Sequence, residues 1–518
     1  MTENNDLLTD EQMIHFITKG YVVLRNELPE QLHRKVMSSI NYAFQEEGNP
    51  GNNILPRVPE IQQFFETPVV KGALTSLLGP DYYMHPHRHC HFNKPGNPEG
   101  QWHKDGFWSS MRSHRPWWAM IFYYTQDVTE ELGPTAIMPG TQYYEKFVGD
   151  RGETLLPTGK AGTMVLVHFD LWHKASLNFS QIDRYMLKFQ FVRLHASTAP
   201  SWNHQSAELK VPAGLPAEHL NLWQDVWNWL RGESTMSGIG AAADALELQR
   251  LEQALASEDA SVRGRAADEL GLIGEAAGSC APALGKLLAD PAETTALNAA
   301  YALGHMGEQG IAELIRQLSE GKTQVAERAA YGLQGAGAAA VPGLVGLLKH
   351  SDEKKAAFAA YTLGMIGPDA GEGVPALIEA AKADSEWLRR NAVESLGMVA
   401  EPAELVVPAL AEELTASLKA ESTPVPERSG DSFINMQRYI ANKIGYTAAL
   451  SLLRAGKNGE SAQVIRALED AMGSKDRYVR AYAMEALTHL QSKEAMNVLI
   501  RYYRTARWCP DTNKASSF

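Results

Sequence analysis

The second half of the chain repeats a hydrophobic pattern with a period of about 30 residues. Leucines followed by glycine or glutamine recur at spacings of 33, 30, 30 and 33, and they are Leu270, Leu303, Leu333, Leu363 and Leu396. A second series keeps step at spacings of 30, 30, 33 and 33, with members Leu284, Leu314, Leu344, Leu377 and Leu410. Two registers that agree over five units predict an α-solenoid rather than a non-repetitive helical bundle.

Prolines indicate where one helix of each unit begins. Four leucines of the second series stand in a Pro-x-Leu frame, which contains Pro282, Pro342, Pro375 and Pro408. Proline is tolerated at the first position of a helix because that amide has no intrahelical acceptor. Each unit is therefore expected to be a proline-started helix, a turn and a second, alanine-rich helix. The pattern resembles the short HEAT-like repeats that also occur in phycobilin lyases; it blurs around 411–470, where 420–431 looks like an insertion.

The first half contains patterns that are typical of strands. The run HPHRHCHF places four histidines on one strand face, namely His85, His87, His89 and His91. We interpret them as cleft-lining or packing residues, with an accessory metal site as the less favoured alternative. The apolar run TMVLVHFDLWH also predicts a strand, and its His168-x-Asp170 pair is interpreted as strand-end structure.

Composition changes sharply near residue 235. Nine of the eleven tryptophans and thirteen of the sixteen histidines come before it, and the later part is rich in Ala, Leu and Gly. The segment Gly232–Ala243 is small, polar and glycine-bearing, as linkers are. We therefore predict two domains, 1–232 and 244–510, and expect the first to bury its own core without help.

Charge and cysteine content exclude several classes of protein. The net charge of -13 argues against a nucleic-acid binder, which would need cations to neutralise phosphates. The three cysteines are too far apart for a disulfide framework. We see neither a signal peptide at the start nor an apolar run long enough to cross a bilayer. A cytoplasmic protein without membrane contact is expected.

Two short segments of the first half carry a candidate metal site. In GQWHKDGFW, His103 and Asp105 stand two positions apart, so in a strand both side chains point to one face. In HKASLNFSQIDR, His173 can add a third ligand, and Arg184 follows eleven residues later. Two histidines and one carboxylate leave three metal positions open, which suits Fe(II) and oxygen activation better than zinc. A buried Arg184 could fork onto the distal carboxylate of a keto-diacid cosubstrate.

These segments resemble the phytanoyl-CoA dioxygenase family of iron/2-oxoglutarate oxygenases. The resemblance covers about residues 8 to 195 and includes GYVVLRNELP, NKPG, the His-x-Asp pair, ELGPTAIMPGTQ and the His173, Asn178, Arg184 group. It departs from the family at Gln142, where histidine is usual, and at Ala175, where a hydroxyl residue is common. The second departure puts one cosubstrate hydrogen bond in doubt.

The resemblance implies a fold, a cofactor and a reaction. The fold would be a double-stranded β-helix (jelly roll) with flanking helices, followed here by the all-α solenoid. Iron would be bound by His103, Asp105 and His173, and 2-oxoglutarate by Arg184, with Tyr123 and Thr135 lining its site. The reaction would use O2 to convert 2-oxoglutarate to succinate and to oxidise an unactivated C–H bond. Halogenating relatives carry Gly or Ala at the position of Asp105, so the carboxylate favours hydroxylation, or a related desaturation or epoxidation.

Three other functions explain the sequence less well. A HEAT-type interaction scaffold with a passive oxygenase-fold module does not explain a complete ligand set with an arginine in register. A di-iron HEAT hydroxylase would need His-Glu pairs on the repeat helices, which are absent from the sequence. A phycobilin-lyase role would leave the first half unexplained. The substrate is expected to be small or carrier-linked, and the solenoid to bind a protein partner or a second copy.

Aromatic and charged residues around Asp105 have two interpretations each. Tryptophans could wall a substrate pocket or belong to the core, and they are Trp102, Trp108, Trp117 and Trp118. The loop residues Arg112, His114 and Arg115 could meet an anionic substrate, although solvent exposure is the default expectation for loop charges.

Overall fold

The computed structural model describes residues 6–106, 109–147, 149, 154–211, 219–233, 244–421 and 440–505. The chain divides into two compact units, Met1–Leu347 and Leu348–Phe518. Trp108, Cys509, most of the expected linker and most of the expected insertion lie outside the described residues. Within the described part, no helix is long and apolar enough to cross a membrane.

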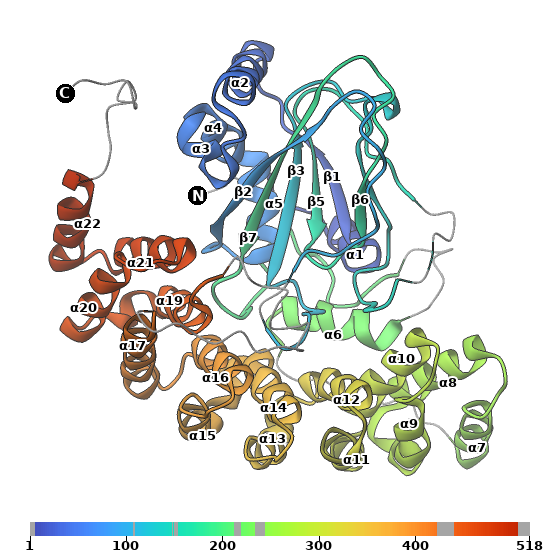
Figure 1. Ribbon diagram of the computed structural model, residues 1–518. Coiled ribbons are helices and arrows are strands. Elements are labelled where there is room, and N and C mark those ends of the chain that lie inside the picture. The colour runs from blue at the N-terminus through green and yellow to red at the C-terminus, as the bar shows by residue number, and fades with distance from the viewer. Residues whose placement is uncertain are drawn as a thin grey trace. The chain divides into compact units, whose positions relative to one another are not determined.

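The N-terminal part of the first unit contains two antiparallel sheets (Figure 1). The larger has the order β1-β5-β3-β7-β2, with bounds Tyr21–Arg25, Thr163–His168, Trp118–Tyr124, Arg184–Val192 and Tyr83–Asn93. The smaller pairs β4 (Thr135–Ile137) with β6 (His173–Ala175). Every strand pair is antiparallel. The predicted jelly-roll fold is confirmed.

Helices cover one face of the larger sheet, and they are α1 (Asp10–Lys19), α2 (Glu30–Tyr42), α3 (Ile54–Arg57), α4 (Gln62–Phe65) and α5 (Pro68–Leu78). Phe65 of α4 stacks on Phe189 of β7, with ring centroids 4.6 Å apart. Because helices cover one face and the smaller sheet lies over the other, every residue of β3, β5 and β7 is buried. Such strands read as nearly continuous apolar runs, so a polar residue within one stands out.

The end of α1 shows how local sequence directs the chain into the sheet. Thr9 and Gln12 form a capping box at the start of α1. Gly20 ends the helix with φ +80, and a Cβ there would lie 2.6 Å from the Gln142 side chain. Only glycine fits this turn, which leads directly into β1.

Helical repeats follow in both units. The first unit contains α7 to α13, with bounds Ala245–Ala254, Ala260–Ile273, Ala281–Leu287, Glu293–Gly304, Gly307–Glu320, Thr323–Gly335 and Val341–Leu347. The second contains α14 to α17 and α19 to α22, with bounds Glu353–Ile366, Val374–Ala380, Glu386–Val399, Ala403–Ala420, Lys443–Ala455, Ala462–Ala471, Arg477–Leu490 and Lys493–Thr505. The predicted solenoid is confirmed, and all ten leucines of the two series are fully buried.

Three of the four prolines stand where the pattern predicts. Pro282, Pro342 and Pro375 are second in α9, α13 and α15. Pro408 is the exception because it lies inside α17, which already begins at Ala403. The expectation of a proline-started helix is wrong for this unit.

One further helix, α6 (Leu220–Leu230), joins the sheet domain to the first repeats. Its Asp225 accepts two hydrogen bonds from the Arg115 guanidinium, at 3.1 and 3.0 Å. Its Asn221 donates to the Asp268 carboxylate of α8 at 2.9 Å. The first compact unit therefore continues to Leu347. The domain limits 1–232 and 244–510 stay a prediction.

The buried Arg115–Asp225 pair should contribute strongly to the stability of the first unit. Arg115→Ala leaves Asp225 as an uncompensated buried charge, so the free energy of unfolding should fall by about 3–5 kcal/mol. Arg34→Ala removes the exposed partner of Glu30 and should cost less than about 1 kcal/mol. Urea denaturation, followed by tryptophan fluorescence, measures both. Equal losses would show that the buried pair contributes no more than a surface pair.

Candidate active site

Three side chains of the sheet domain converge on one point. The ligand atoms of His103, Asp105 and His173 lie within 4.8 Å of one another, and no other such group of three occurs in the described residues. The two imidazole centroids are 4.4 Å apart, and Asp105 Oδ1 lies 3.6 Å from His173 Nε2. The geometry is that of a site for a single cation.

Backbone pairing brings the two histidines together. His173 begins β6, and each histidine donates its N–H to the other's carbonyl at 3.0 Å. His103 lies in this isolated bridge, and Asp105 follows in irregular backbone. The expected convergence is present, although His103 and Asp105 lie in no regular strand.

Hydrogen bonds on the far side of each ring set its tautomer. His103 Nδ1 lies 2.9 Å from the Gln101 carbonyl, and His173 Nδ1 lies 2.9 Å from the Leu171 carbonyl. A carbonyl only accepts, so each Nδ1 carries the proton and each Nε2 keeps its lone pair. Burial and the Lys188 charge also lower the pKa of His173, which favours the neutral imidazole that metals bind.

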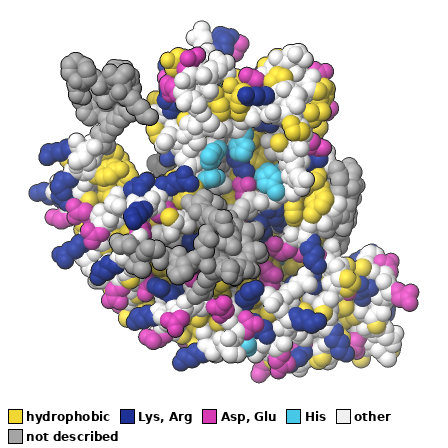
Figure 2. Space-filling model, viewed as in Figure 1, with side chains coloured by type: hydrophobic (Ala, Val, Ile, Leu, Met, Phe, Trp, Pro, Cys, Tyr) yellow, Lys and Arg dark blue, Asp and Glu magenta, His cyan; other side chains and the backbone are white. Residues whose placement is uncertain are grey.

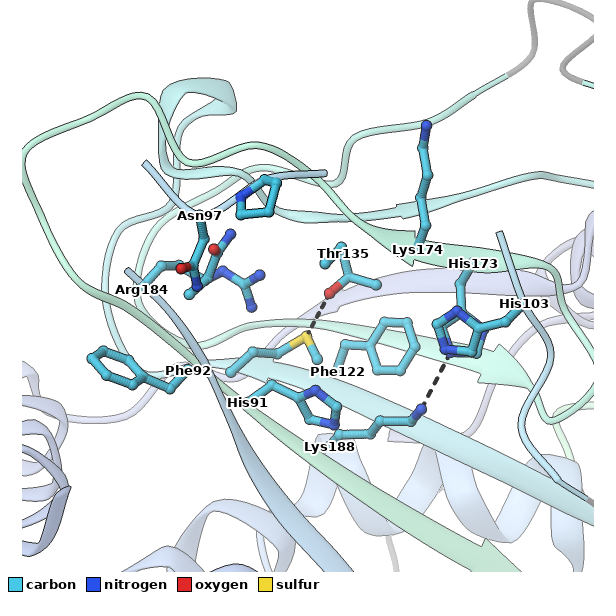
Figure 3. Close-up of a pocket in the computed structure, with 14 residues that line it drawn as sticks. His91, Phe92, Asn97, His103, Phe122, Thr135, His173, Lys174, Arg184 and Lys188 are labelled. Carbon is cyan, nitrogen blue, oxygen red and sulfur yellow. Dashed lines mark hydrogen bonds between the residues drawn. The ribbon is translucent and has the colours of Figure 1, made fainter. Parts of the chain in front are cut away.

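A lysine occupies the centre of this group. Lys188 Nζ lies 2.8 and 2.7 Å from the two Asp105 oxygens. It also lies 3.2 Å from His173 Nε2 (Figure 3). Gln190 Nε2 donates to Asp105 at 3.2 Å. Burial would raise the pKa of Asp105, but Lys188 and the His173 contact hold it well below its usual range. The ammonium supplies the positive charge that a metal would otherwise bring.

The group opens into a pocket of about 370 Å³. Arg184 lies at the opposite end of the pocket from His103 and His173 (Figure 3). Its Nη2 donates to the Gly133 carbonyl at 2.9 Å, while its buried Nε and Nη1 have no partner among the described residues. Burial lowers the pKa of this guanidinium. Buried donors left without acceptors are unfavourable, and a carboxylate bound in the pocket would supply an acceptor.

The two remaining cosubstrate predictions have different outcomes. Thr135 lines the pocket, with its hydroxyl 3.2 Å from the Met186 sulfur. Tyr123 does not. Its hydroxyl lies 2.8 Å from His33 Nε2 of α2, and its ring stacks on Phe64 at 4.7 Å. Tyr123 therefore faces the helical layer, and its neighbour Phe122 lines the pocket.

The histidine-rich strand β2 contributes one of its four histidines to this pocket. His91 lines it, whereas His85 is buried against Trp118 at 5.1 Å between ring centroids. A register shift between Met84 and Arg88 interrupts the alternation that the sequence suggests. Histidines also gather on one area of the surface over the sheet domain (cyan in Figure 2).

Other residues near Asp105 are structural. Asp170 is paired with Arg112, so the second His-x-Asp forms no ligand group. Trp117 and Trp118 are buried core residues outside the pocket lining. Solvent exposure, the default expectation for the loop charges, is wrong: Arg112, His114 and Arg115 are 9%, 2% and 4% exposed.

Lys188 and Gln190 are the site residues that the sequence analysis missed. A signal was available in strand β7, RYMLKFQFV, where alternation places Arg184, Met186, Lys188 and Gln190 on one face. A lysine and a glutamine inside a fully buried strand require polar partners. Those partners must lie on the face of β7 that also carries Arg184, so the sequence already indicated polar groups on that face.

A jelly-roll sheet with this ligand group defines an oxygenase domain, here followed by helical repeats. Family models agree with both assignments. Residues 19–186 match phytanoyl-CoA dioxygenase (PhyH), and residues 248–334 and 341–422 match HEAT repeats. The resemblance drawn from the sequence is confirmed, and residues 19–186 include all six predicted site residues. A search of curated proteins finds no match.

Several solved structures are similar to the first part of the chain. The carbocyclase SnoK from nogalamycin biosynthesis is 17% identical over 38% of this chain and 89% of its own, with a TM-score of 0.32. EctD from S. alaskensis, with 2-oxoglutarate and 5-hydroxyectoine, is 18% identical over 37% of this chain and 79% of its own, with a TM-score of 0.31. The non-heme monooxygenase ThoJ, in a nickel complex, is 15% identical over 39% of this chain and 86% of its own, with a TM-score of 0.29. Likeness at this level says nothing about the substrate of this chain.

Removal of the internal cation should strengthen metal binding. A metal at the His103, Asp105, His173 group has to displace Lys188 Nζ from the Asp105 carboxylate. Lys188→Met keeps the bulk without the charge and leaves the metal-free Asp105 unpaired. We expect the Mn(II) dissociation constant to fall about tenfold, or about 1.4 kcal/mol, and the metal-free protein to unfold at lower temperature.

Isothermal titration with Mn(II) and thermal unfolding of the metal-free protein measure these two effects. The control Lys160→Met removes the exposed partner of Asp127 and should change neither. Weaker Mn(II) binding by Lys188→Met would show that Lys188 supports the metal rather than competing with it.

Proposed function

We propose that residues 1–232 form an Fe(II)- and 2-oxoglutarate-dependent dioxygenase that hydroxylates an unactivated C–H bond. Its substrate would be a small or carrier-linked organic molecule, and 2-oxoglutarate would become succinate and CO2. One observation carries the proposal: a preformed His, Asp, His group and a buried, partly unpaired arginine lie at opposite ends of the same pocket.

The metal would be held by His103 Nε2, His173 Nε2 and the Asp105 carboxylate. Two imidazoles and one carboxylate form the facial set that suits non-heme Fe(II), with three positions left for cosubstrate and oxygen. Iron, when bound, supplies the activation of O2 that oxidation of an unactivated C–H bond requires. The hydrogen bonds of His103 to Gln101 and of His173 to Leu171 keep both Nε2 atoms ready for the metal.

The cosubstrate would be anchored through its distal carboxylate. Arg184 offers buried N–H groups that have no partner among the described residues, and Thr135 offers a hydroxyl from the same pocket wall. A guanidinium binds a carboxylate through two parallel hydrogen bonds, which also orients the cosubstrate. Burial makes the interaction strong because water does not compete for the charge.

Apolar side chains between the two ends would exclude water. Phe122 lies 5.7 Å from His173 between ring centroids, and Met186 lies beside Thr135. Such walls hold an organic substrate near the metal and keep solvent from the reacting atoms. Asp105 fills the position that halogenating relatives leave open, so hydroxylation is favoured.

The alternative is a HEAT-repeat scaffold with a passive oxygenase-fold module. A passive module gains nothing from buried guanidinium nitrogens that lack partners or from histidines set in one tautomer, since both reduce stability or restrict packing. The repeats would add a second role to catalysis. We propose that they bind a protein partner or a second copy of the chain, as extended repeat surfaces commonly do.

The ligand assignment predicts a spectroscopic change. Anaerobic Fe(II) and 2-oxoglutarate should give the wild-type protein a weak visible charge-transfer band, and His103→Ala or His173→Ala should abolish it. His15→Ala, at an exposed position on α1, should keep the band. Normal iron and cosubstrate binding by the His103→Ala/His173→Ala double variant would exclude the assignment.

The anchor assignment predicts a loss of cosubstrate affinity. Arg184→Lys keeps the charge but removes the bidentate fork, so the dissociation constant for 2-oxoglutarate should rise tenfold or more, about 1.4 kcal/mol. Titration of the same absorption band measures it. Arg57→Lys, at an exposed pair with Glu47, serves as the control. An unchanged dissociation constant in Arg184→Lys would point to another anchor.

A further inference from the structure

Residues 109–117, which follow Asp105 in the chain, form an enclosed segment without regular structure. They lie between the sheet domain and the repeat helices α10 and α12, as the contacts of His114 and Arg115 show. Asp105 lies in irregular backbone four residues before it. Because Arg112 of the segment donates to the Asp105 carbonyl, whatever holds the segment also influences where the Asp105 carboxylate points.

His114 is held by tyrosines from two successive repeats. Its Nδ1 lies 2.8 Å from the Tyr301 hydroxyl of α10. Its ring stacks on Tyr331 of α12, with centroids 3.9 Å apart and an interplanar angle of 14°. The two tyrosines are 30 residues apart, so they occupy the same position in neighbouring repeats. Burial lowers the pKa of His114 well below its usual range, and the neutral ring suits this stacked environment.

Arg112 links this contact to the metal group. The Tyr331 hydroxyl donates to the Arg112 carbonyl at 3.1 Å. The Arg112 guanidinium donates to the Asp105 carbonyl at 3.0 Å and is paired with Asp170 at the end of β5. Direct hydrogen bonds thus run from a repeat helix to the backbone of Asp105.

A second anchor follows three residues later. Arg115, already paired with Asp225 of α6, also donates to the Gln334 carbonyl of α12 at 3.2 Å. His114, Arg115, Tyr301 and Tyr331 are buried, so the hydrogen bonds between them and their partners are shielded from exchange with water. The segment is held at its middle by Tyr301 and Tyr331 and at its end by α6 and α12.

We propose that the first HEAT repeats position the metal ligand Asp105, with Tyr301 and Tyr331 as positioning residues that act through His114 and Arg112. The inference rests on the proposed function, because it takes Asp105 as a ligand. His103 and His173 are held by backbone pairing to each other, whereas Asp105 has no such pairing. Its carboxylate is oriented by Lys188 and Gln190, and metal binding displaces Lys188. The segment must then keep the carboxylate in place.

The test uses the full-length protein and conservative variants. Tyr331→Phe and Tyr301→Phe keep the rings and remove only the hydroxyls that contact Arg112 and His114. Tyr446→Phe is the matched control, because its buried hydroxyl lies 3.1 Å from that of Tyr482 within the second unit. All three lose a buried tyrosine hydroxyl, and two of them touch the segment.

Two readouts separate positioning from general stability. Titration of metal-free protein with Mn(II), followed by electron paramagnetic resonance, gives the dissociation constant and the symmetry of the site. Amide hydrogen exchange of residues 105–117 without metal reports how firmly the segment is held. Tyr331→Phe should weaken Mn(II) binding about two- to tenfold, as loss of one hydrogen bond implies, and should speed exchange in 105–117. The double variant Tyr301→Phe/Tyr331→Phe should weaken Mn(II) binding and speed exchange more strongly. The Mn(II) dissociation constant of Tyr446→Phe should stay within about twofold of wild type.

The possible outcomes distinguish the two proposals. Mn(II) binding that persists in the His103→Ala/His173→Ala variant, or that is absent from wild type, overturns the proposed function and this inference with it. A second result is Mn(II) binding that depends on His103 and His173, with Tyr301→Phe and Tyr331→Phe matching Tyr446→Phe in both Mn(II) affinity and amide exchange. That result overturns only the further inference. Lower melting temperature alone, without a change in Mn(II) affinity or exchange, has the same meaning, because it shows a purely structural contact.

Discussion

Charge buried on one face of strand β7 is the constraint on which the site depends. The strand is buried throughout, yet Arg184, Lys188 and Gln190 all lie on its pocket face. An apolar interior tolerates such groups only when they are paired. Lys188 and Gln190 donate hydrogen bonds to Asp105. Arg184 donates to one carbonyl and keeps two nitrogens without partners among the described residues, which are available to an incoming anion. The ligand geometry, the pocket and the anchor thus follow from a single strand whose polar face needs partners.

Much of the fold and part of the site could be predicted from residue spacing. The leucine period was sufficient for the repeats because each repeat contacts only its neighbours, so local pattern determines local structure. His103, Asp105, His173, Arg184 and Thr135 come together in the structure, and the phytanoyl-CoA dioxygenase match covers them. Tyr123 shows the limit. It pairs with Leu187 across the sheet, and Phe122 pairs with Lys188, so which of the two lines the pocket depends on a register that one sequence does not reveal.

The loop after Asp105 shows a second limit. Composition divides the chain near residue 235, but burial depends on contacts between segments more than 180 residues apart, such as His114 with Tyr301. Arg112, His114 and Arg115 look like surface residues because charged loops usually face solvent. Several of their partners lie on α6, α10 and α12, and the local sequence does not reveal these contacts. For the same reason, a change in composition indicates where one kind of structure ends but not where a compact unit does.

The two tyrosines that hold His114 also limit how the repeat region can change in length. Solenoids commonly gain or lose whole repeats, since a new unit meets neighbours like those it replaces. Here Tyr301 and Tyr331 meet one fixed loop, and Glu293 of α10 accepts from the backbone of Glu145 in the sheet domain. A repeat inserted between α8 and α12 would shift these contacts out of register. Growth by whole units is compatible with this architecture only beyond α12, so the early repeats behave as parts of the enzyme and the later ones as an extendable array.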